Sequence, residues 1–191
     1  NIFIFVVFIT VLLSLVVFDN VQKIIFEMVS AFSTTGFSLS TISTLPHLMI
    51  MLIIIGMIIG GGIASTAGGI KISRIYTLLA MVPWTLKKII SPRHAIIPFK
   101  VNNKVVEPEE NNIVVVYVAI YFTILVSGTI IFLLLGNNFL DSAFQITSAL
   151  GTVGLQTMSL ATLPIIGKVI LVLAMILGRL EIFPIIILVR N

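Results

Sequence analysis

The chain has 191 residues, of which 59% are hydrophobic and 9% are charged, and its mean hydropathy is +1.24. Soluble domains carry about 25% charged residues, so this composition excludes an ordinary soluble enzyme and a disordered nucleic-acid-binding tail. The net charge is only +4, and there is no cysteine for a disulfide framework or a thiolate metal site. The composition therefore predicts a membrane protein.

The apolar residues form five long runs and two short ones. The long runs cover residues 2–18, 48–63, 70–86, 113–135 and 165–189, and the short ones cover residues 21–32 and 139–150. About 20 apolar residues are needed to cross a membrane core of about 30 Å. The first run is slightly shorter than this and starts directly after Asn1, so we expect the chain to be a fragment whose first span begins upstream. No charged segment precedes the run, so no signal peptide is recognisable.

The two short runs are interpreted as re-entrant half-helices. A helix of about a dozen residues crosses only half of the membrane core, and a polar turn follows each run. The alternative is a helix lying flat on the membrane surface, which typically has a charged face. Lys23 and Glu27 are four residues apart in the first run, but the second run has only Asp141. The sequence therefore favours two segments that enter the membrane and return to the same side.

The chain contains an internal repeat with an offset of 118 residues. Residues 26–60 align with residues 144–178 without a gap, and eleven of the 35 positions are identical. The identities include Thr34/Thr152, Gly36/Gly154 and Pro46/Pro164. Apolar composition alone would not match these polar and glycine positions in one register. We predict an all-α membrane protein with two parallel repeats, each made of a span, a half-helix, a polar turn and a second span.

Seven of the eleven basic residues lie between the two copies. They are Lys71, Arg74, Lys87, Lys88, Arg93, Lys100 and Lys104. Cytoplasmic loops carry an excess of lysine and arginine, so this part is predicted to be cytoplasmic and both half-helices to enter from the outer face. The predicted units are a first repeat at 1–90, a connector at 91–112 and a second repeat at 113–191.

The turns after the half-helices contain hydroxyls and glycines but no ionisable side chain. They read Ser-Thr-Thr-Gly-Phe-Ser at 33–38 and Gly-Thr-Val-Gly-Leu-Gln at 151–156. Carbonyl oxygens of such extended segments can replace the hydration shell of a monovalent cation, and the negative C-terminal ends of the half-helices favour a cation nearby. The alternative is that the turns only pack helices closely. The predicted K⁺ ligands are the backbone carbonyls of Thr34, Thr35, Gly36, Phe37, Thr152, Val153, Gly154 and Leu155.

A glycine-rich stretch at 60–69 interrupts the apolar run after the first turn. It lacks the Gly-Lys-Ser/Thr of a phosphate-binding loop, so it is interpreted as a gate beneath the turn or, alternatively, as a hinge or a close-packing kink. Arg179 lies deep in the last apolar run and aligns with Gly61. A charge there needs a partner or water, so Arg179 is either part of the gate barrier, a structural ion pair or a side chain reaching the cytoplasmic edge. The gate candidates are Gly60, Gly61, Gly62, Ser65, Thr66, Gly68, Gly69 and Arg179.

Several segments together resemble the C-terminal half of a Trk-type potassium-uptake membrane subunit, the TrkH/TrkG group of the Trk/Ktr/HKT superfamily. They are the turns at 33–38 and 150–155, Ala-Ser-Thr-Ala-Gly-Gly-Ile-Lys at 64–71, Pro-Arg-His-Ala-Ile-Ile-Pro at 92–98 and Gly-Arg-Leu-Glu-Ile-Phe-Pro at 178–184. The resemblance implies four pore-loop repeats around one pore, of which these are the third and fourth. It also implies a gating loop at 60–69, Arg179 beneath the filter, a homodimer in the bacterial inner membrane and a cytoplasmic nucleotide-binding regulatory subunit similar to TrkA.

The residues and the resemblance together predict a multi-pass membrane protein through which K⁺ moves down its electrochemical gradient. No nucleophile–base pair or metal cluster is visible in the sequence, so we expect neither an enzyme nor an organic cofactor, and no nucleic-acid partner. Three alternatives remain open. They are a two-repeat cation channel completed by dimerisation, a non-conducting membrane scaffold subunit, and a secondary transporter with a midplane site, which normally needs an ionisable residue there.

Overall fold

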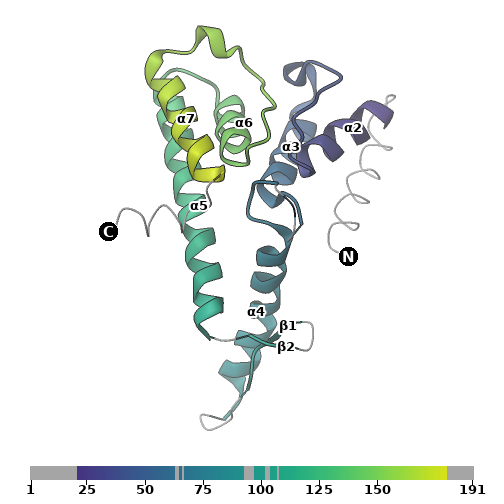
Figure 1. Cartoon of the computed structure of the whole chain (residues 1–191), viewed down its shortest axis with the longest axis vertical. Coiled ribbons are helices and arrows are strands. Elements are labelled where there is room, and N and C mark those ends of the chain that lie inside the picture. The colour runs from purple at the N-terminus through teal and green to yellow at the C-terminus, as the bar shows by residue number, and fades with distance from the viewer. Residues whose placement is uncertain are drawn as a thin grey trace.

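The computed structural model describes residues 21–62, 65, 67–92, 97–101, 104–106 and 108–179, and this part is mostly helical (Figure 1). Its elements are α2 (Val21–Phe32), the 3₁₀ turn η1 (Ile42–Thr44), α3 (His47–Ile59), α4 (Ile72–Ile90), the strands β1 (Lys100–Val101) and β2 (Lys104–Val105), α5 (Pro108–Leu134), α6 (Phe139–Leu150), the 3₁₀ turn η2 (Leu160–Thr162) and α7 (Ile165–Arg179). Helices α2 and α3 pack together as one group, and α5, α6 and α7 form a second group with α6 between the other two. The two groups meet where α3 contacts α6. Below them, α4 contacts α5 (Figure 1).

Helix α5 is the one described helix that is long and apolar enough to cross a membrane. Its 27 residues rise about 1.5 Å each and reach about 40 Å. It begins at Pro108, before the predicted run 113–135, so that Glu109 and Glu110 stand exposed in its first turn. The predicted span at 2–18 and the continuation of the last run after Arg179 lie outside the described residues.

Helix α3 is shorter than the apolar run that contains it. It has 13 residues and ends at Ile59, although the run continues to residue 63. Gly60 follows with φ +67°, a left-handed conformation that ends a helix and that glycine adopts without a steric penalty. After Gly60 the chain folds back, because the amides of Ile70 and Lys71 donate to the carbonyls of Ile58 and Ile59 at 2.9 and 3.0 Å.

Both predicted half-helices have the expected bounds, as α2 and α6. Each has 12 residues and is therefore about 18 Å long, half of a membrane crossing. Helix α6 is buried along most of its length, from Ser142 to Leu150 except for Ala143. Its small and polar side chains allow α5 and α7 to enclose it, as is common where helices pack closely in membrane proteins.

The backbone of the two sequence copies corresponds element by element at the same offset of 118 residues. Helix α2, η1 and the start of α3 match α6, η2 and the start of α7. In the turns, Thr34 and Thr152 have φ 54° and 53°, and Gly36 and Gly154 have φ 80° and 92°. A positive φ is rare for a threonine, so its occurrence at both aligned positions indicates that the turns share one local conformation.

One apolar core joins the two copies. Phe32, Ile53 and Met57 from the first copy and Phe144 and Leu155 from the second are all buried in the same cluster. Burial of aromatic and branched side chains is the main stabilising term in packing of this kind. This shared core holds the two polar turns next to each other.

The prediction of an all-α protein misses a small hairpin in the connector. Strands β1 and β2 pair in antiparallel register, with Lys100 opposite Val105 and Val101 opposite Lys104. Trp84 of α4 contacts the residues just before this hairpin. Its indole nitrogen donates to the Ile97 carbonyl at 3.1 Å, and its ring packs with its centre 5.2 Å from that of the Phe99 ring. Two-residue strands leave too little periodicity to be recognised in a sequence.

Candidate functional site

The two polar turns meet at their glycines. A Cβ atom added to Gly36 would overlap the carbonyl oxygen of Val153 in the other turn. The opposite glycine, Gly154, has open space at its own Cβ position among the described residues. Residues 34–37 and 152–155, which the sequence predicts as ion ligands, therefore lie against each other rather than on separate faces of the fold.

Equivalent hydrogen bonds hold each turn to its own half-helix. The hydroxyl of Ser30 donates to the Phe37 carbonyl and that of Ser148 to the Leu155 carbonyl, both at 2.6 Å. The amides of Thr35 and Val153 donate back to the carbonyls of Ser30 and Ser148, at 3.0 and 2.9 Å. A carbonyl oxygen has two lone pairs, so the Phe37 and Leu155 carbonyls keep one acceptor position beyond the serine bond.

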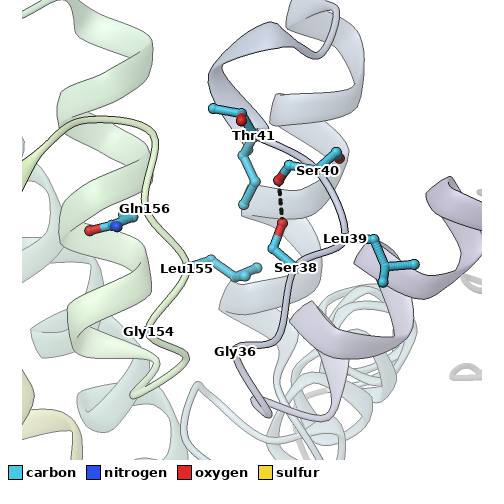
Figure 2. Close-up of a pocket in the computed structure, with 9 residues that line it drawn as sticks. Gly36, Ser38, Leu39, Ser40, Thr41, Gly154, Leu155 and Gln156 are labelled. Carbon is cyan, nitrogen blue, oxygen red and sulfur yellow. Dashed lines mark hydrogen bonds between the residues drawn. The ribbon is translucent and has the colours of Figure 1, made fainter.

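A cavity of about 500 Å³ lies on one side of the meeting turns (Figure 2). It is lined by Gly36, Ser38, Leu39, Ser40, Thr41, Ile42, Gly154, Leu155 and Gln156. The first turn and the segment 38–42 form one wall and residues 154–156 form the other, with Gly36 and Gly154 facing each other (Figure 2). The lining offers hydroxyl, amide and backbone oxygens and no carboxylate, so the cavity can hold water and a weakly held cation.

A second cavity, of about 260 Å³, lies between the second turn, the glycine stretch and α7. It is lined by Ser65, Ala67, Gly68, Gly69, Lys71, Tyr117, Thr152, Gly178 and Arg179. Four gate candidates, Ser65, Gly68, Gly69 and Arg179, thus share one cavity with Thr152 of the predicted filter. Gly60 and Gly61 are buried and are not among its lining residues, Gly62 is exposed, and Thr66 lies outside the described residues.

The glycine stretch lies directly against the second turn. A Cβ atom at Gly68 would overlap the Gly151 carbonyl oxygen and come within 2.6 Å of the Thr152 hydroxyl oxygen. On its other side the stretch contacts α5, since the hydroxyl of Tyr117 donates to the Gly69 carbonyl at 3.4 Å. The guanidinium of Arg74 in α4 lies 4.0 Å from the centre of the Tyr117 ring, a distance typical of a cation–π interaction. The contact between Arg74 and Tyr117 has no signal in the sequence, since 43 positions separate the two residues.

The electrostatics of the site favour a cation near the turns. Both α2 and α6 run toward the turns and end there, so each presents the negative end of its dipole. The described residues contain no group of three or more histidines, cysteines, aspartates or glutamates that could hold a metal ion. The oxygens that line the larger cavity are backbone carbonyl, hydroxyl and amide oxygens, which are ligands that suit an alkali ion.

Comparison with known proteins gives the family. A family model described as TrkH, cation transport protein, matches residues 2–191. The chain belongs to the TrkH family. This agrees with the resemblance carried by the turns, the glycine stretch and the segment around Arg179, and the family is described as one of cation transport proteins.

Several members of the TrkH family are similar to this chain over most of its length. A cation transporter of Methanocaldococcus jannaschii, itself uncharacterised, is 34% identical over 171 residues, which are 86% of this chain and 35% of that protein. The Trk system potassium uptake protein TrkH of Halomonas elongata is 32% identical over 89% of this chain and 36% of its own length. The crystal structure of the potassium transporter TrkH from Vibrio parahaemolyticus superposes with a TM-score of 0.83 at 25% identity, covering 97% of this chain and 42% of that one. The chain thus spans about a third of the length of the curated relatives.

Proposed function

We propose that this chain supplies two of four pore loops in a K⁺-uptake transporter, and that its half-helices are re-entrant segments that return to the outer face. The observation that carries the proposal is the contact between Gly36 and the Val153 carbonyl oxygen, which joins two turns rich in carbonyl oxygens between two cavities. The names of the TrkH relatives, which include potassium uptake proteins, support K⁺ as the ion. The chain covers about a third of its relatives, so the rest of a full-length protein has room for two further loops.

In this mechanism a K⁺ ion enters the larger cavity with its water and loses part of that hydration shell at the turns. The backbone carbonyls of residues 34–37 and 152–155 replace the lost water oxygens. The serine bonds to the Phe37 and Leu155 carbonyls fix the spacing of these oxygens. The ion then reaches the smaller cavity, where the glycine stretch 60–69 and Arg179 form the gate.

Uptake of Rb⁺ as a K⁺ substitute tests the proposed function directly. The natural full-length protein is produced in cells that lack their own K⁺ uptake systems, and growth at low K⁺ is followed together with Rb⁺ influx. We expect rescue of growth and influx that external K⁺ inhibits more strongly than Na⁺. A protein that reaches the membrane but restores neither growth nor influx would act instead as a non-conducting scaffold subunit.

Arg179→Ala tests the gate. Arg179 and Lys71 place two positive charges on the smaller cavity, and a cation that passes them meets a repulsion of about 1–3 kcal/mol at an effective dielectric constant near 20. Removing the Arg179 charge is therefore expected to raise Rb⁺ influx about fivefold. Arg179→Lys keeps the charge and serves as the matched control, with influx close to that of the natural protein. Equal influx in all three proteins would remove Arg179 from the gate.

The assembly belongs to the same proposal. A second copy of the membrane subunit and a cytoplasmic nucleotide-binding regulatory subunit would complete the transporter, the latter on the side of the basic connector. The lysines of α4 and of the hairpin support a cytoplasmic placement of this side. Chemical crosslinking of the natural protein in bacterial inner membranes, followed by measurement of the mass of the product, tests the dimer.

A further inference from the structure

Glu27 is a buried carboxylate behind the first turn. It lies in α2 with 1% of its surface exposed, although burying a carboxylate is costly unless hydrogen bonds compensate. In the sequence, Glu27 is notable only because it lies four residues from Lys23, as on a charged face of a surface helix. Lys23 is exposed, and the compensation for Glu27 comes from another part of the chain.

The last residue of the turn, Ser38, and the next two residues donate hydrogen bonds to one oxygen of Glu27. Its Oε1 accepts from the amides of Leu39 and Ser40, at 2.8 and 3.2 Å, and from the Ser40 hydroxyl at 3.3 Å. The Ser38 hydroxyl lies 2.9 Å from the same oxygen but shares its single proton with the Ser40 carbonyl (Figure 2). Hydrogen bonds to a carboxylate are roughly twice as strong as those between neutral groups. Glu27 therefore fixes the segment 38–40, which lines the larger cavity directly after the Phe37 carbonyl.

The second copy does not have this attachment. The position equivalent to Glu27 is Gln145, which is also buried, at 4% exposure. Among the described residues, its Oε1 atom has no hydrogen-bond partner, and neither has the buried hydroxyl oxygen of Thr157, the position equivalent to Leu39. The second carboxylate oxygen of Glu27, Oε2, also has no partner in this part of the chain, so the two copies differ in the bonds that Oε1 of Glu27 accepts. Both copies keep the serine bond to residue 37 or 155, so the carboxylate bonds are what distinguishes the first turn from the second.

We infer that Glu27 is a positioning residue for ion discrimination at the outer mouth of the filter. It does not contact the ion. It holds the segment 38–40 and, through it, the Phe37 carbonyl at a fixed distance from the opposite turn, while the second turn has only the serine and backbone bonds that both turns share. This inference rests on the proposed K⁺ transport. It adds that part of the ion selectivity comes from the hydrogen bonds of Glu27, which support the first turn and have no equivalent at the second.

Two substitutions separate a positioning role from an effect of charge. Glu27→Gln keeps the length of the side chain and removes the charge, whereas Glu27→Asp keeps the charge and withdraws the oxygen by about 1.5 Å, beyond hydrogen-bond reach of Leu39 and Ser40. We expect both variants to lower the ratio of Rb⁺ to Na⁺ influx about three- to tenfold. Glu109→Gln is the matched control, because Glu109 is exposed in the first turn of α5, and its ratio is expected to equal that of the natural protein.

Hydrogen exchange of the purified full-length protein gives a second readout that does not require transport. Amide exchange at Leu39 and Ser40 is expected to become about tenfold faster in both Glu27 variants, with no change at residues 155–158. Wild-type discrimination in Glu27→Asp, or unchanged amide exchange in both variants, would overturn the inference. If the natural protein takes up no Rb⁺, the proposed function fails, and the exchange rates still decide whether Glu27 fixes the segment.

Discussion

Replacing Gly36 by alanine is expected to reduce K⁺ uptake at least about tenfold while the protein still reaches the membrane. Two effects add at this position. An L-residue at φ +80° is strained by about 1–2 kcal/mol, and the new methyl group would overlap the Val153 carbonyl oxygen. Either the first turn or this proposed ligand must move, and ion coordination depends on distances defined to a few tenths of an ångström. Rb⁺ influx, normalised to the amount of protein in the membrane, measures the effect.

The same substitution at Gly154 is the matched comparison. Its φ of +92° imposes a similar backbone strain, but no described atom lies within 4 Å of the position that its Cβ would take. We therefore expect Gly154→Ala to lose less influx than Gly36→Ala. We also expect it to discriminate between K⁺ and Na⁺ less well than the natural protein does. An equal loss in both variants would show that backbone strain alone matters and that the contact between the turns has no role.

Replacing Gly178 by alanine is expected to destabilise the packing of α7 on α6 by about 1–3 kcal/mol. A Cβ atom here would overlap the Leu150 carbonyl oxygen and lie 2.8 Å from the Leu150 carbonyl carbon. Both contacts are to backbone at the end of α6, so no flexible side chain can move aside. For a protein of the relatives' length, the change corresponds to a fall of about 1–3 °C in melting temperature, measured on the purified full-length protein in detergent.

Gly167→Ala in the same helix is the control for this prediction. The nearest atoms to its Cβ position are Leu135 Cδ1, Phe132 Cζ and Leu163 Cδ2, at 3.5, 3.7 and 3.8 Å, which are ordinary van der Waals distances. Alanine also favours the helix over glycine by about 1 kcal/mol, so the melting temperature should rise slightly. A similar decrease for both variants would mean that α6 and α7 do not approach as closely as Leu150 and Gly178 indicate.

The first and last residues of the half-helices could be predicted because strong local signals mark both ends. Asn138 precedes α6, and the turn at 151–154 follows it, so polar residues mark both ends of an apolar run. The bounds of α3 and α5 were less certain. A left-handed Gly60 ends α3 inside its apolar run, while α5 takes in polar residues from Pro108 onward. Hydropathy is insensitive to both features because it reports composition rather than backbone conformation.

The candidate site was predictable only in part. The turns and the glycine stretch were found because their composition and their repeat register depart from an ordinary apolar span. The role of Glu27 could not be found in this way, since its donors lie 11 to 13 residues further along the chain and two of them are backbone amides. Arg74 and Tyr117 are likewise brought together only by the packing of α4 on α5.

Composition, periodicity and the repeat by themselves predicted a membrane protein of two related units, with two turns whose oxygens suit a cation. The match to the TrkH family agrees with the first of these predictions. These signals can be found in the sequence, because they depend on the type and order of residues and not on which distant side chains pack together. The tertiary structure alone decided that Gly36 abuts the Val153 carbonyl, that Gly68 lies against the second turn and that a carboxylate supports one turn but not the other. Such contacts depend on how closely the apolar surfaces of α3 and α6 pack together. The distance between these two helices is set by side chains from both, so neither segment of sequence determines it alone.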